Sequence, residues 1–445
     1  MKDYRQVADA VAEEIRTGGL RPGDRLPPQR EFARGCGIAD STAARVYREL
    51  ARRGLTVGEV GRGTYVRAAR AGVGPALSEP AGSRIDLELN HPVVPEQAAL
   101  LATGLGGLLR PDVLESVLRP AGAAGTPEAR EAAAGLLARG GWRPDPRRVL
   151  FAGNGRQALS AVLGALVPPG GRLGVEELTY PVVKAIAARL GITLVPLAMD
   201  ADGVIPEALD EANRSAPLRA VYVQPTLHNP LSLTLSDGRL AQLAAVLERL
   251  DLPAVEDAVW GFLREGTAPL AAVAPGRTVL VDSLSKRLAP GLTLGFAVVP
   301  PGLDGAVGAA LRSGGLGPAR FALEAAVRWQ TDGTVDALVR AKRRDAGVRQ
   351  EIARRALDGF AVSGDPGSYH CWWVLPRPWR ADTFVAAAAR HGIGVTPAAA
   401  FCAGQGRTPH AVRLGLASPS ADELTRALGT LAGLARSAPE DLALD

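Results

Sequence analysis

The sequence has few of the residues that build disulfide frameworks or metal sites. Its three cysteines, Cys36, Cys371 and Cys402, lie far apart without a CxxC pair, and its five histidines show neither an HExxH nor a His-x3-His spacing. Those patterns are typical of disulfide scaffolds, thiolate metal sites and zinc hydrolases, so none of these classes is indicated. We expect ordinary buried or partly buried thiols and no bound metal.

Long apolar runs are missing as well. No positively charged segment followed by an apolar one opens the sequence, and Arg, Asp or Glu interrupts every apolar stretch before it could span a bilayer. We therefore expect a cytoplasmic protein without a membrane partner. A chain of 445 residues with 47% hydrophobic residues can bury more than one core, which favours two or more domains.

Positive charge is concentrated at the start of the chain. Residues 1–70 contain 14 Lys and Arg against 9 Asp and Glu, and this surplus equals the formal net charge of +5 of the whole protein. A basic first part joined to a neutral second part indicates that the first part meets a polyanion. Charge alone is also typical of a merely solvated surface, so the local patterns have to decide.

Those patterns predict a winged helix-turn-helix. Helical spacing over 4–17, a proline pair before a second short helix, and the N-cap candidates Asp40 and Ser41 predict three helices. The third has an apolar face and a cationic face, and from the latter Arg45 and Arg48 can reach bases or phosphates in the major groove. The following segment, LTVGEVGRGTYV, predicts a hairpin with Arg62 at its tip.

Residues 1–67 resemble the DNA-binding domain of the GntR family through LRPGDRLPPQREFA, STAARVYREL and GRGTYV. The resemblance implies a double-stranded DNA operator as partner. It implies direct DNA contacts from Arg30, Ser41, Thr42, Arg45, Gly63 and Thr64. Asp40 departs from the family, because an arginine is common there, and an acid repels phosphate or accepts a hydrogen bond from cytosine. The operator sequence therefore cannot be transferred from relatives.

The rest of the chain predicts a linker and one large domain. Residues 68–84 are rich in Ala, Gly, Pro and Ser without hydrophobic periodicity, which is typical of a linker. From 85 to 445, Ala- and Leu-rich helical segments alternate with short β-rich runs such as RAVYVQP and RTVLVDS. This alternation predicts an α/β fold with a mostly parallel sheet, in which ligands bind at the carboxyl ends of the strands.

Four polar clusters fall at the predicted strand ends: the turn AGNGRQAL at 152–159, Asn229 before Pro230, Asp257, and Lys286. Each has a plain explanation on its own, namely a tight turn, an Asn-Pro turn, a paired carboxylate and a solvated charge. The chemical alternatives are a phosphate site at a helix N-terminus, a carboxylate that holds a cationic ring nitrogen, and a lysine that condenses with an aldehyde. The residues by themselves leave both explanations open.

The order of these clusters behind a GntR-like domain resembles the MocR subfamily, whose large domain is of the fold-type I aminotransferase kind. The resemblance covers roughly residues 85–430 and implies that Lys286 forms a Schiff base with pyridoxal 5′-phosphate (PLP), while Asp257 pairs with its ring nitrogen. The other implied cofactor contacts are Asn229 to the phenolic oxygen, Tyr180 on the ring, and Asn154, Gly155, Arg156 and Ser283 around the phosphate. Arg413 matches an arginine that binds a ligand carboxylate, although alone it is also compatible with a surface ion pair.

Several positions depart from the MocR pattern. Thr293 stands where the family has an arginine that binds the cofactor phosphate, a loss of about 1.5 to 3 kcal/mol in affinity unless Arg156 or Arg287 supplies the charge. Trp260 replaces a tyrosine that shares the phenolic oxygen with the asparagine. Asn-Pro-Leu-Ser replaces Asn-Pro-Thr-Gly, and the tyrosine expected before GTPEAR is absent. The residues for covalent attachment are retained, whereas the surrounding contacts have changed.

Three hypotheses follow. The first is a transcription regulator, a homodimer by resemblance, in which a small amino compound exchanges onto PLP at Lys286 and shifts the DNA-binding domains. The second is a working aminotransferase with a DNA-binding domain attached, which the changed contacts disfavour because catalysis needs close positioning. In the third, the large domain binds another ligand or serves only dimerisation. Neither the effector nor the direction of regulation follows from the sequence.

Overall fold

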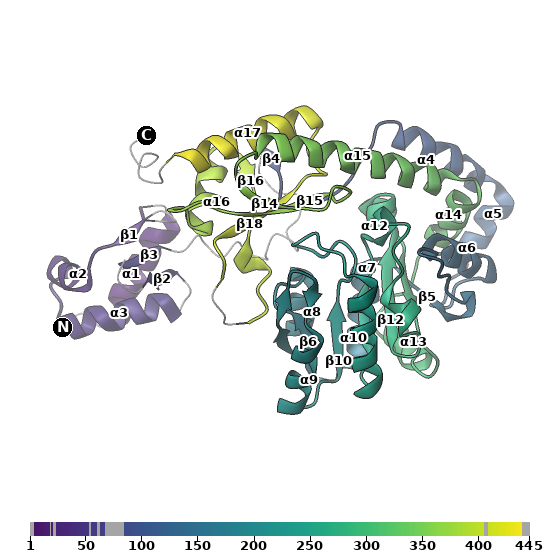
Figure 1. The fold of residues 1–445 in the computed structure, drawn as a ribbon, viewed down its shortest axis with the longest axis horizontal. Coiled ribbons are helices and arrows are strands. Elements are labelled where there is room, and N and C mark those ends of the chain that lie inside the picture. The colour runs from purple at the N-terminus through teal and green to yellow at the C-terminus, as the bar shows by residue number, and fades with distance from the viewer. Residues whose placement is uncertain are drawn as a thin grey trace.

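The fold consists of a small N-terminal domain, a large sheet with helices on both faces, and a smaller C-terminal sheet (Figure 1). A computed structural model describes residues 4–17, 19–20, 24–52, 55–59, 63–66, 84–404 and 408–437. Of the expected linker 68–84, these ranges include only Arg84. Within them, no helix combines the length and the apolar character needed to cross a membrane.

The N-terminal domain is a winged helix, as predicted. Its helices are α1 (Tyr4–Thr17), α2 (Gln29–Cys36) and α3 (Asp40–Arg52). Its antiparallel sheet has the order β1-β3-β2 and consists of β1 (Arg25–Leu26), β2 (Thr56–Glu59) and β3 (Gly63–Val66). The apolar face of α3 is buried against α1, with Ala43, Val46 and Leu50 fully inaccessible. Because α3 begins at Asp40, both Asp40 and Ser41 lie in its first turn, and neither predicted N-cap residue is at the N-cap.

Seven strands form the large sheet in the order β5-β13-β12-β11-β10-β6-β7. They are β5 (Val149–Ala152), β6 (Arg172–Glu176), β7 (Thr193–Leu197), β10 (Ala220–Val223), β11 (Ala254–Asp257), β12 (Thr278–Ser283) and β13 (Gly295–Val298). Strand β13 is antiparallel to both neighbours and the other pairs are parallel, so the sheet is mostly parallel as predicted.

Helices cover both faces of the large sheet because its strands are apolar on both sides. One face packs against α7 (Gly155–Leu166), α8 (Pro181–Leu190) and α13 (Asp304–Ser313). The other face packs against α6 (Pro127–Leu137), α9 (Pro206–Ser215), α10 (Asp237–Arg249) and α14 (Arg320–Thr331). Shorter elements fill the loops: α4 (Gln97–Gly106), α5 (Pro111–Val117), α11 (Leu270–Val273), α12 (Leu284–Arg287) and the hairpin of β8 (Met199–Asp200) and β9 (Gly203–Val204).

The C-terminal region has its own core around an antiparallel sheet of order β14-β15-β18-β17. Its strands are β14 (Ala361–Ser363), β15 (His370–Val374), β17 (Thr396–Pro397) and β18 (Ala411–Gly415), and its helices are α15 (Thr334–Ala356), α16 (Ala381–Arg390) and α17 (Ala421–Arg436). Strand β4 (Ile85–Asp86) pairs in parallel with β16 (Ile393–Gly394). The first residues after the linker are thereby joined to the C-terminal region.

The turn between β5 and α7 packs closely on β13. Asn154 caps α7, since its Oδ1 accepts the Gln157 N–H at 2.9 Å. Gly295 pairs with Ala152 in the sheet, and a Cβ atom at Gly295 would lie 2.3 Å from the Asn154 carbonyl oxygen and 2.5 Å from its carbon. The close approach of the two backbones leaves room for no side chain at this position.

We expect Gly295→Ala to destabilise the protein by about 1 to 3 kcal/mol, because overpacking here has to displace the backbone of the turn. Urea unfolding measures this change. Gly305→Ala is the control, since Gly305 is an exposed residue of α13 with nothing within 4 Å of the added Cβ. In that control the free energy of unfolding should rise by up to about 1 kcal/mol, because alanine is the better helix former. Equal effects of the two substitutions would contradict the packing argument.

Candidate functional site

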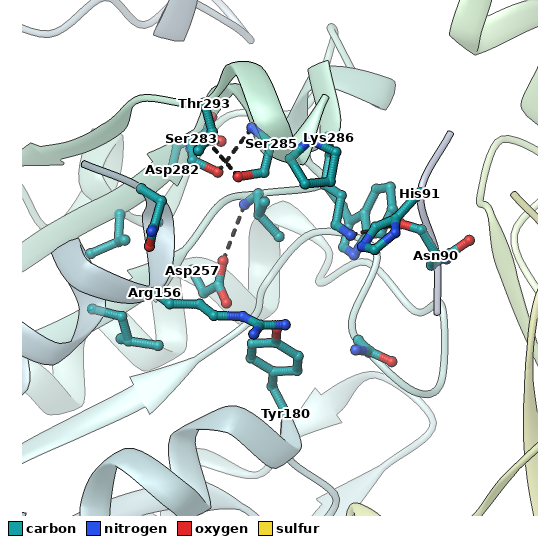
Figure 2. A pocket seen from close by; sticks show the side chains of 18 of the residues that line it. Asn90, His91, Arg156, Tyr180, Asp257, Asp282, Ser283, Ser285, Lys286 and Thr293 are labelled. Atoms are coloured by element: carbon teal, nitrogen blue, oxygen red, sulfur yellow. Dashed lines mark hydrogen bonds between the residues drawn. The ribbon is translucent and has the colours of Figure 1, made fainter. Parts of the chain in front are cut away.

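A cavity of about 330 Å³ opens at the carboxyl ends of the central parallel strands. It is lined by all nine residues predicted from the large domain: Asn154, Gly155, Arg156, Tyr180, Asn229, Asp257, Ser283, Lys286 and Arg413. Figure 2 shows Arg156, Tyr180, Asp257, Ser283 and Lys286 around this space. The fold therefore gathers side chains that are spread over more than half of the sequence.

Asp257 ends β11 with a buried carboxylate. The Tyr222 hydroxyl donates to its Oδ2 at 2.7 Å, the Gln224 Nε2 donates to the same oxygen at 3.0 Å, and the Val259 N–H donates to Oδ1 at 3.2 Å. In the described part of the chain it forms no ion pair. Burial raises the pKa of Asp257 to about 6, although these donors act in the opposite direction. The carboxylate is held in place but its charge has no counter-ion.

Lys286 lies three residues after β12, in the short helix α12. Its Nζ donates to the Asn90 carbonyl at 2.6 Å and lies 5.5 Å from the centre of the Trp260 ring. Burial, followed by the charges of Arg156 and Arg413, lowers the pKa of Lys286 to about 7. A large share of this amine is therefore neutral, and able to act as a nucleophile, near neutral pH.

Small residues and hydroxyls form one side of the cavity. Figure 2 shows Ser283, Ser285 and Thr293 grouped there, with the Ser285 Oγ and Thr293 Oγ1 atoms 2.6 Å apart. A Cβ atom at Gly155 would lie 3.0 Å from the Ser283 Oγ atom, so the start of α7 lies directly beside this group. Backbone N–H groups at a helix N-terminus together with hydroxyls suit an anion.

Arg287 does not supply the charge that is missing at Thr293. Its Nη2 atom lies 2.6 Å from Asp282 Oδ2 in a buried ion pair, and its guanidinium lies 5.3 Å from the centre of the Phe262 ring. Arg287 does not line the cavity, whereas Arg156 does. Of the two alternatives, Arg156 is therefore the one left to neutralise an anion at the start of α7.

Tyr180 and Asn229 lie on the walls of the cavity. Burial raises the pKa of Tyr180, whose hydroxyl interacts with Arg156, so the phenol is neutral. The Asn229 backbone N–H donates to Gln224 Oε1 at 3.2 Å. Its side-chain Oδ1 is buried and has no hydrogen-bond partner among the described residues. An unpartnered buried amide is costly, which indicates a place for a ligand.

The loop that carries Asn229 is fixed by the C-terminal region. Ser232, in the family's glycine position, has a φ of 59°, a left-handed conformation that glycine adopts more easily. Its hydroxyl donates to the His370 carbonyl at 2.7 Å and lies 3.0 Å from the Ser368 hydroxyl. These contacts give a physical reason why serine is accepted there.

Arg413 lies on β18 with only 7% of its surface exposed, which excludes a surface ion pair. Its Nη2 donates to the Glu88 carbonyl at 2.6 Å and to Thr396 Oγ1 at 3.3 Å, whereas its Nε is buried without a partner in the described residues. Burial lowers the pKa of Arg413 to about 10, so the group stays cationic at neutral pH.

Two groups of site residues were not predicted from the sequence. Tyr222 and Gln224 hold Asp257, and their spacing of two on the apolar strand VYVQ is a signal that could have indicated one shared face. Asn90 and His91 enter the cavity from the segment after β4, and Figure 2 shows His91 beside Lys286. Burial and Lys286 lower the pKa of His91 to about 4, so its imidazole is neutral. No local pattern marks these two residues.

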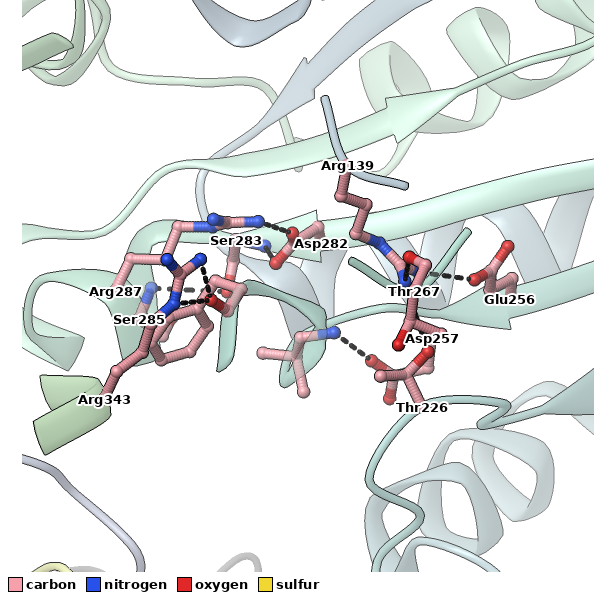
Figure 3. Close-up of polar contacts among 12 residues, drawn as sticks. Arg139, Thr226, Glu256, Asp257, Thr267, Asp282, Ser283, Ser285, Arg287 and Arg343 are labelled. Atoms are coloured by element: carbon pink, nitrogen blue, oxygen red, sulfur yellow. Dashed lines mark hydrogen bonds and ion pairs between the residues drawn. The ribbon is translucent and has the colours of Figure 1, made fainter. Parts of the chain in front are cut away.

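A buried ion pair, formed by Glu256 and Arg139, lies beside Asp257 (Figure 3). Unlike Asp257, the Glu256 carboxylate has a counter-ion. Glu256, the preceding residue of β11, accepts from Arg139 Nη2 at 2.9 Å, and both side chains are almost fully inaccessible. The Arg139 Nη1 atom also donates to the Thr267 carbonyl at 2.8 Å. Two adjacent buried carboxylates thus have different surroundings, one with an arginine and one with neutral donors.

We therefore expect opposite effects from neighbouring substitutions in the ligand-free protein. Glu256→Gln should lower the free energy of unfolding by about 3 to 5 kcal/mol because Arg139 loses its counter-charge. Asp257→Asn should raise the free energy of unfolding by about 1 to 3 kcal/mol above pH 6. The sign follows from the raised pKa of Asp257: its ionised form is unfavourable in the fold, so the gain is full above about 6 and disappears toward the ordinary value of 3.8. Urea unfolding from pH 4.5 to 7.5 measures both, and a loss for Asp257→Asn at pH 7 would contradict the argument.

The predicted DNA-binding residues lie on the winged helix as follows. Arg30 on α2 and Ser41, Arg45 and Arg48 on α3 are exposed, and Thr42 is half-buried. Gly63 and Thr64 begin β3, and Arg62 lies outside the described residues. Arg45 also packs its guanidinium 5.7 Å from the centre of the Tyr4 ring. One face of α3 is therefore cationic and open. No cluster of three or more His, Cys, Asp or Glu in the described chain has the arrangement of a metal site.

Comparisons with known proteins cover both parts of the chain. Residues 117–431 match the family described as "Aminotransferase class I and II", and residues 3–66 match "Bacterial regulatory proteins, gntR family". The archaeal alanine:glyoxylate aminotransferase structure has a TM-score of 0.73 at 21% identity, over 80% of this chain and 91% of that one. The large domain therefore has the fold-type I aminotransferase fold.

Two relatives that match over two thirds or more of this chain are named as regulators. The "Uncharacterized HTH-type transcriptional regulator YdeF" of Bacillus subtilis is 28% identical over 429 residues, which are 96% of this chain and 92% of that protein. The "Probable rhizopine catabolism regulatory protein MocR" of Rhizobium meliloti is 29% identical over 67% of this chain and 66% of its own. The chain thus belongs to the class I and II aminotransferase family and, with its GntR domain, to the MocR-type transcription regulators.

Proposed function

We propose that this regulator binds PLP covalently at Lys286 and responds to a small amino compound that competes for the same aldehyde. The observation that carries the proposal is one cavity that contains a largely neutral lysine amine and a buried carboxylate without a counter-ion. When bound, PLP supplies an aldehyde, which condenses with an amine with loss of water, and a cationic ring nitrogen.

The residues present fit this cofactor. Asp257 offers its charge to the ring nitrogen, Asn229 offers its side-chain N–H to the phenolic oxygen, and the neutral Tyr180 packs on the ring. Around the phosphate we place Asn154, Gly155, Arg156 and Ser283. The hydroxyls of Ser285 and Thr293 add neutral donors where the family has an arginine. Arg156 supplies the positive charge for this group.

The proposed effector carries an amine and a carboxylate. Lys286 marks the place of the amine, and Arg413 lies on the same cavity with a buried Nε that lacks a partner in the described chain. A guanidinium binds a carboxylate through two parallel hydrogen bonds, so Arg413 orients the compound with its amine toward the aldehyde. The neutral imidazole of His91 beside Lys286 offers a hydrogen-bond acceptor to the incoming amine.

The proposed assembly is a homodimer. Three apolar side chains in the segment 93–118 are strongly exposed in the single chain: Val93 at 60%, Leu109 at 70% and Leu118 at 85%. Val93 follows His91 by two residues, so this segment begins next to the cavity. Large exposed apolar side chains are enriched at interfaces.

A second candidate function rests on Thr293. Without the phosphate arginine, the cavity could bind an amino compound that is not PLP-linked, and the domain would then act as a plain ligand-binding and dimerisation module. Residual aminotransferase activity is a third outcome. The visible absorption spectrum of the protein with PLP separates the second candidate from the others, and turnover of amino donors with a keto acid separates an enzyme from a sensor.

We expect full-length protein with PLP to develop a visible absorption band that is lost in Lys286→Ala. Lys286→Arg should lose it too, because a guanidinium keeps the charge but does not condense with the aldehyde. The chain has four lysines, and Lys184→Arg is the matched control that keeps the band. No band in the wild-type protein, or an equal band in Lys286→Ala, would overturn the proposal of PLP at this residue.

We expect Arg45→Ala and Arg48→Ala to weaken binding to a duplex selected from a random pool. Each lost phosphate contact should lower the slope of log K against log salt by about one unit. Arg147→Ala in the large domain is the control, because Arg147 is exposed and paired with Asp145. Filter binding of the full chain at several salt concentrations measures the slope. A slope unchanged in both α3 variants would contradict a phosphate-contacting role for this face.

A further inference from the structure

Lys342 is a fully buried lysine that lies directly behind Lys286. It belongs to α15, and its side chain has no solvent-accessible surface. Its Nζ donates to the Lys286 carbonyl at 3.0 Å and to the Leu288 carbonyl at 2.5 Å. Both acceptors lie at the C-terminal end of α12, the four-residue helix that carries Lys286. An ammonium group at this end binds carbonyls that have no partner within the short helix, and the Leu288 carbonyl also accepts from Gln97 Nε2 at 3.2 Å.

No carboxylate pairs with Lys342 within the described residues. The nearest acid on its own helix, Asp345, accepts from Arg349 Nε at 2.8 Å and from the Tyr369 hydroxyl at 2.9 Å. The same hydroxyl donates to the Lys342 carbonyl at 2.7 Å, which fixes the backbone of α15 at this point. A buried ammonium without a carboxylate is expensive, and a methionine of similar length would be the more stable choice. Stability therefore does not explain why a lysine occupies position 342.

We propose that Lys342 is a positioning residue for Lys286: its ammonium holds the end of α12, and its charge keeps the Lys286 amine in the neutral, reactive form. This role rests on the proposed function, in which Lys286 is the amine that condenses with the PLP aldehyde. The geometry places the two amines on opposite sides of one short backbone segment, with Lys342 in the core and Lys286 in the cavity.

The charges around Lys286 support this role. After burial, the cations Arg156, Arg413 and Lys342 lower the pKa of Lys286, and Asp257 raises it. These groups face Lys286 from α7, β18, α15 and β11, and the neutral His91 faces it from the segment after β4. Burial lowers the pKa of Lys342 to about 7, with Asp345 acting in the opposite direction. Lys342 is therefore largely charged below about pH 7, where its charge opposes protonation of Lys286.

Trace labelling with acetic anhydride tests the proposal without PLP. The neutral amine attacks the anhydride, an acetyl group is bonded to Nζ, and acetate and a proton are released. Peptide mass spectrometry then gives the rate at Lys286 against pH for the full-length protein. Lys342→Met should move the midpoint of this profile to higher pH and lower the rate at pH 7 by about 2-fold or more, because a rise of half a unit from a pKa of about 7 lowers the neutral fraction at pH 7 from about one half to about one quarter.

Two further variants separate charge from packing. Lys342→Arg keeps the charge and the donors and should give nearly the wild-type profile, and Arg344→Met removes an exposed cation from the same helix and should leave it unchanged. A wild-type profile in Lys342→Met overturns the proposal, as does an equal shift in Lys342→Arg. If thermal unfolding shows that Lys342→Met does not fold, Lys342→Gln, a neutral donor, replaces it in the same comparison. A protein that fails to bind PLP while passing this test would overturn the proposed function and leave the role of Lys342 intact.

Discussion

Two groups of opposite charge, the buried Asp257 carboxylate and the half-buried Lys286 amine, face one cavity without forming an ion pair in the described structure. Each is costly to bury, and each is held by groups that do not neutralise it. Tyr222 and Gln224 hold the carboxylate, while Asn90 and Lys342 hold the amine and its backbone. The cavity therefore keeps a nucleophile and an anion available for a ligand, and the surrounding fold supplies the stability that this arrangement costs.

The site is built from elements that belong to separate cores. The start of α7 and the ends of β11 and β12 belong to the large sheet, whereas Arg413 lies on β18 of the C-terminal sheet. Helix α15 contributes Leu338 to the large-sheet core and Ala353 to the C-terminal core, and Lys342 lies between them. Ser232 joins the Asn229 loop to β15. A ligand that contacts both Lys286 and Arg413 therefore acts on the relative position of the two cores.

The C-terminal region also contacts the winged helix. The Arg380 guanidinium, just before α16, lies 5.2 Å from the centre of the Tyr65 ring on β3. Figure 1 shows the winged helix beside the C-terminal sheet and away from the large sheet. The contact joins a strand of the wing to the region that also carries Arg413.

Local patterns in the sequence determined the winged helix, the mostly parallel sheet and the residues that lie at strand ends, because these depend on periodicity and on turns within about ten residues. Asn154, Asp257 and Lys286 were predicted on this basis together with the resemblance, and the structure places them around one cavity. Tertiary structure alone decided that Arg287 pairs with Asp282, that Arg413 is buried, and that His91 and Lys342 lie beside Lys286. These relations join residues far apart in the chain, and they depend on packing and desolvation, which no local pattern encodes.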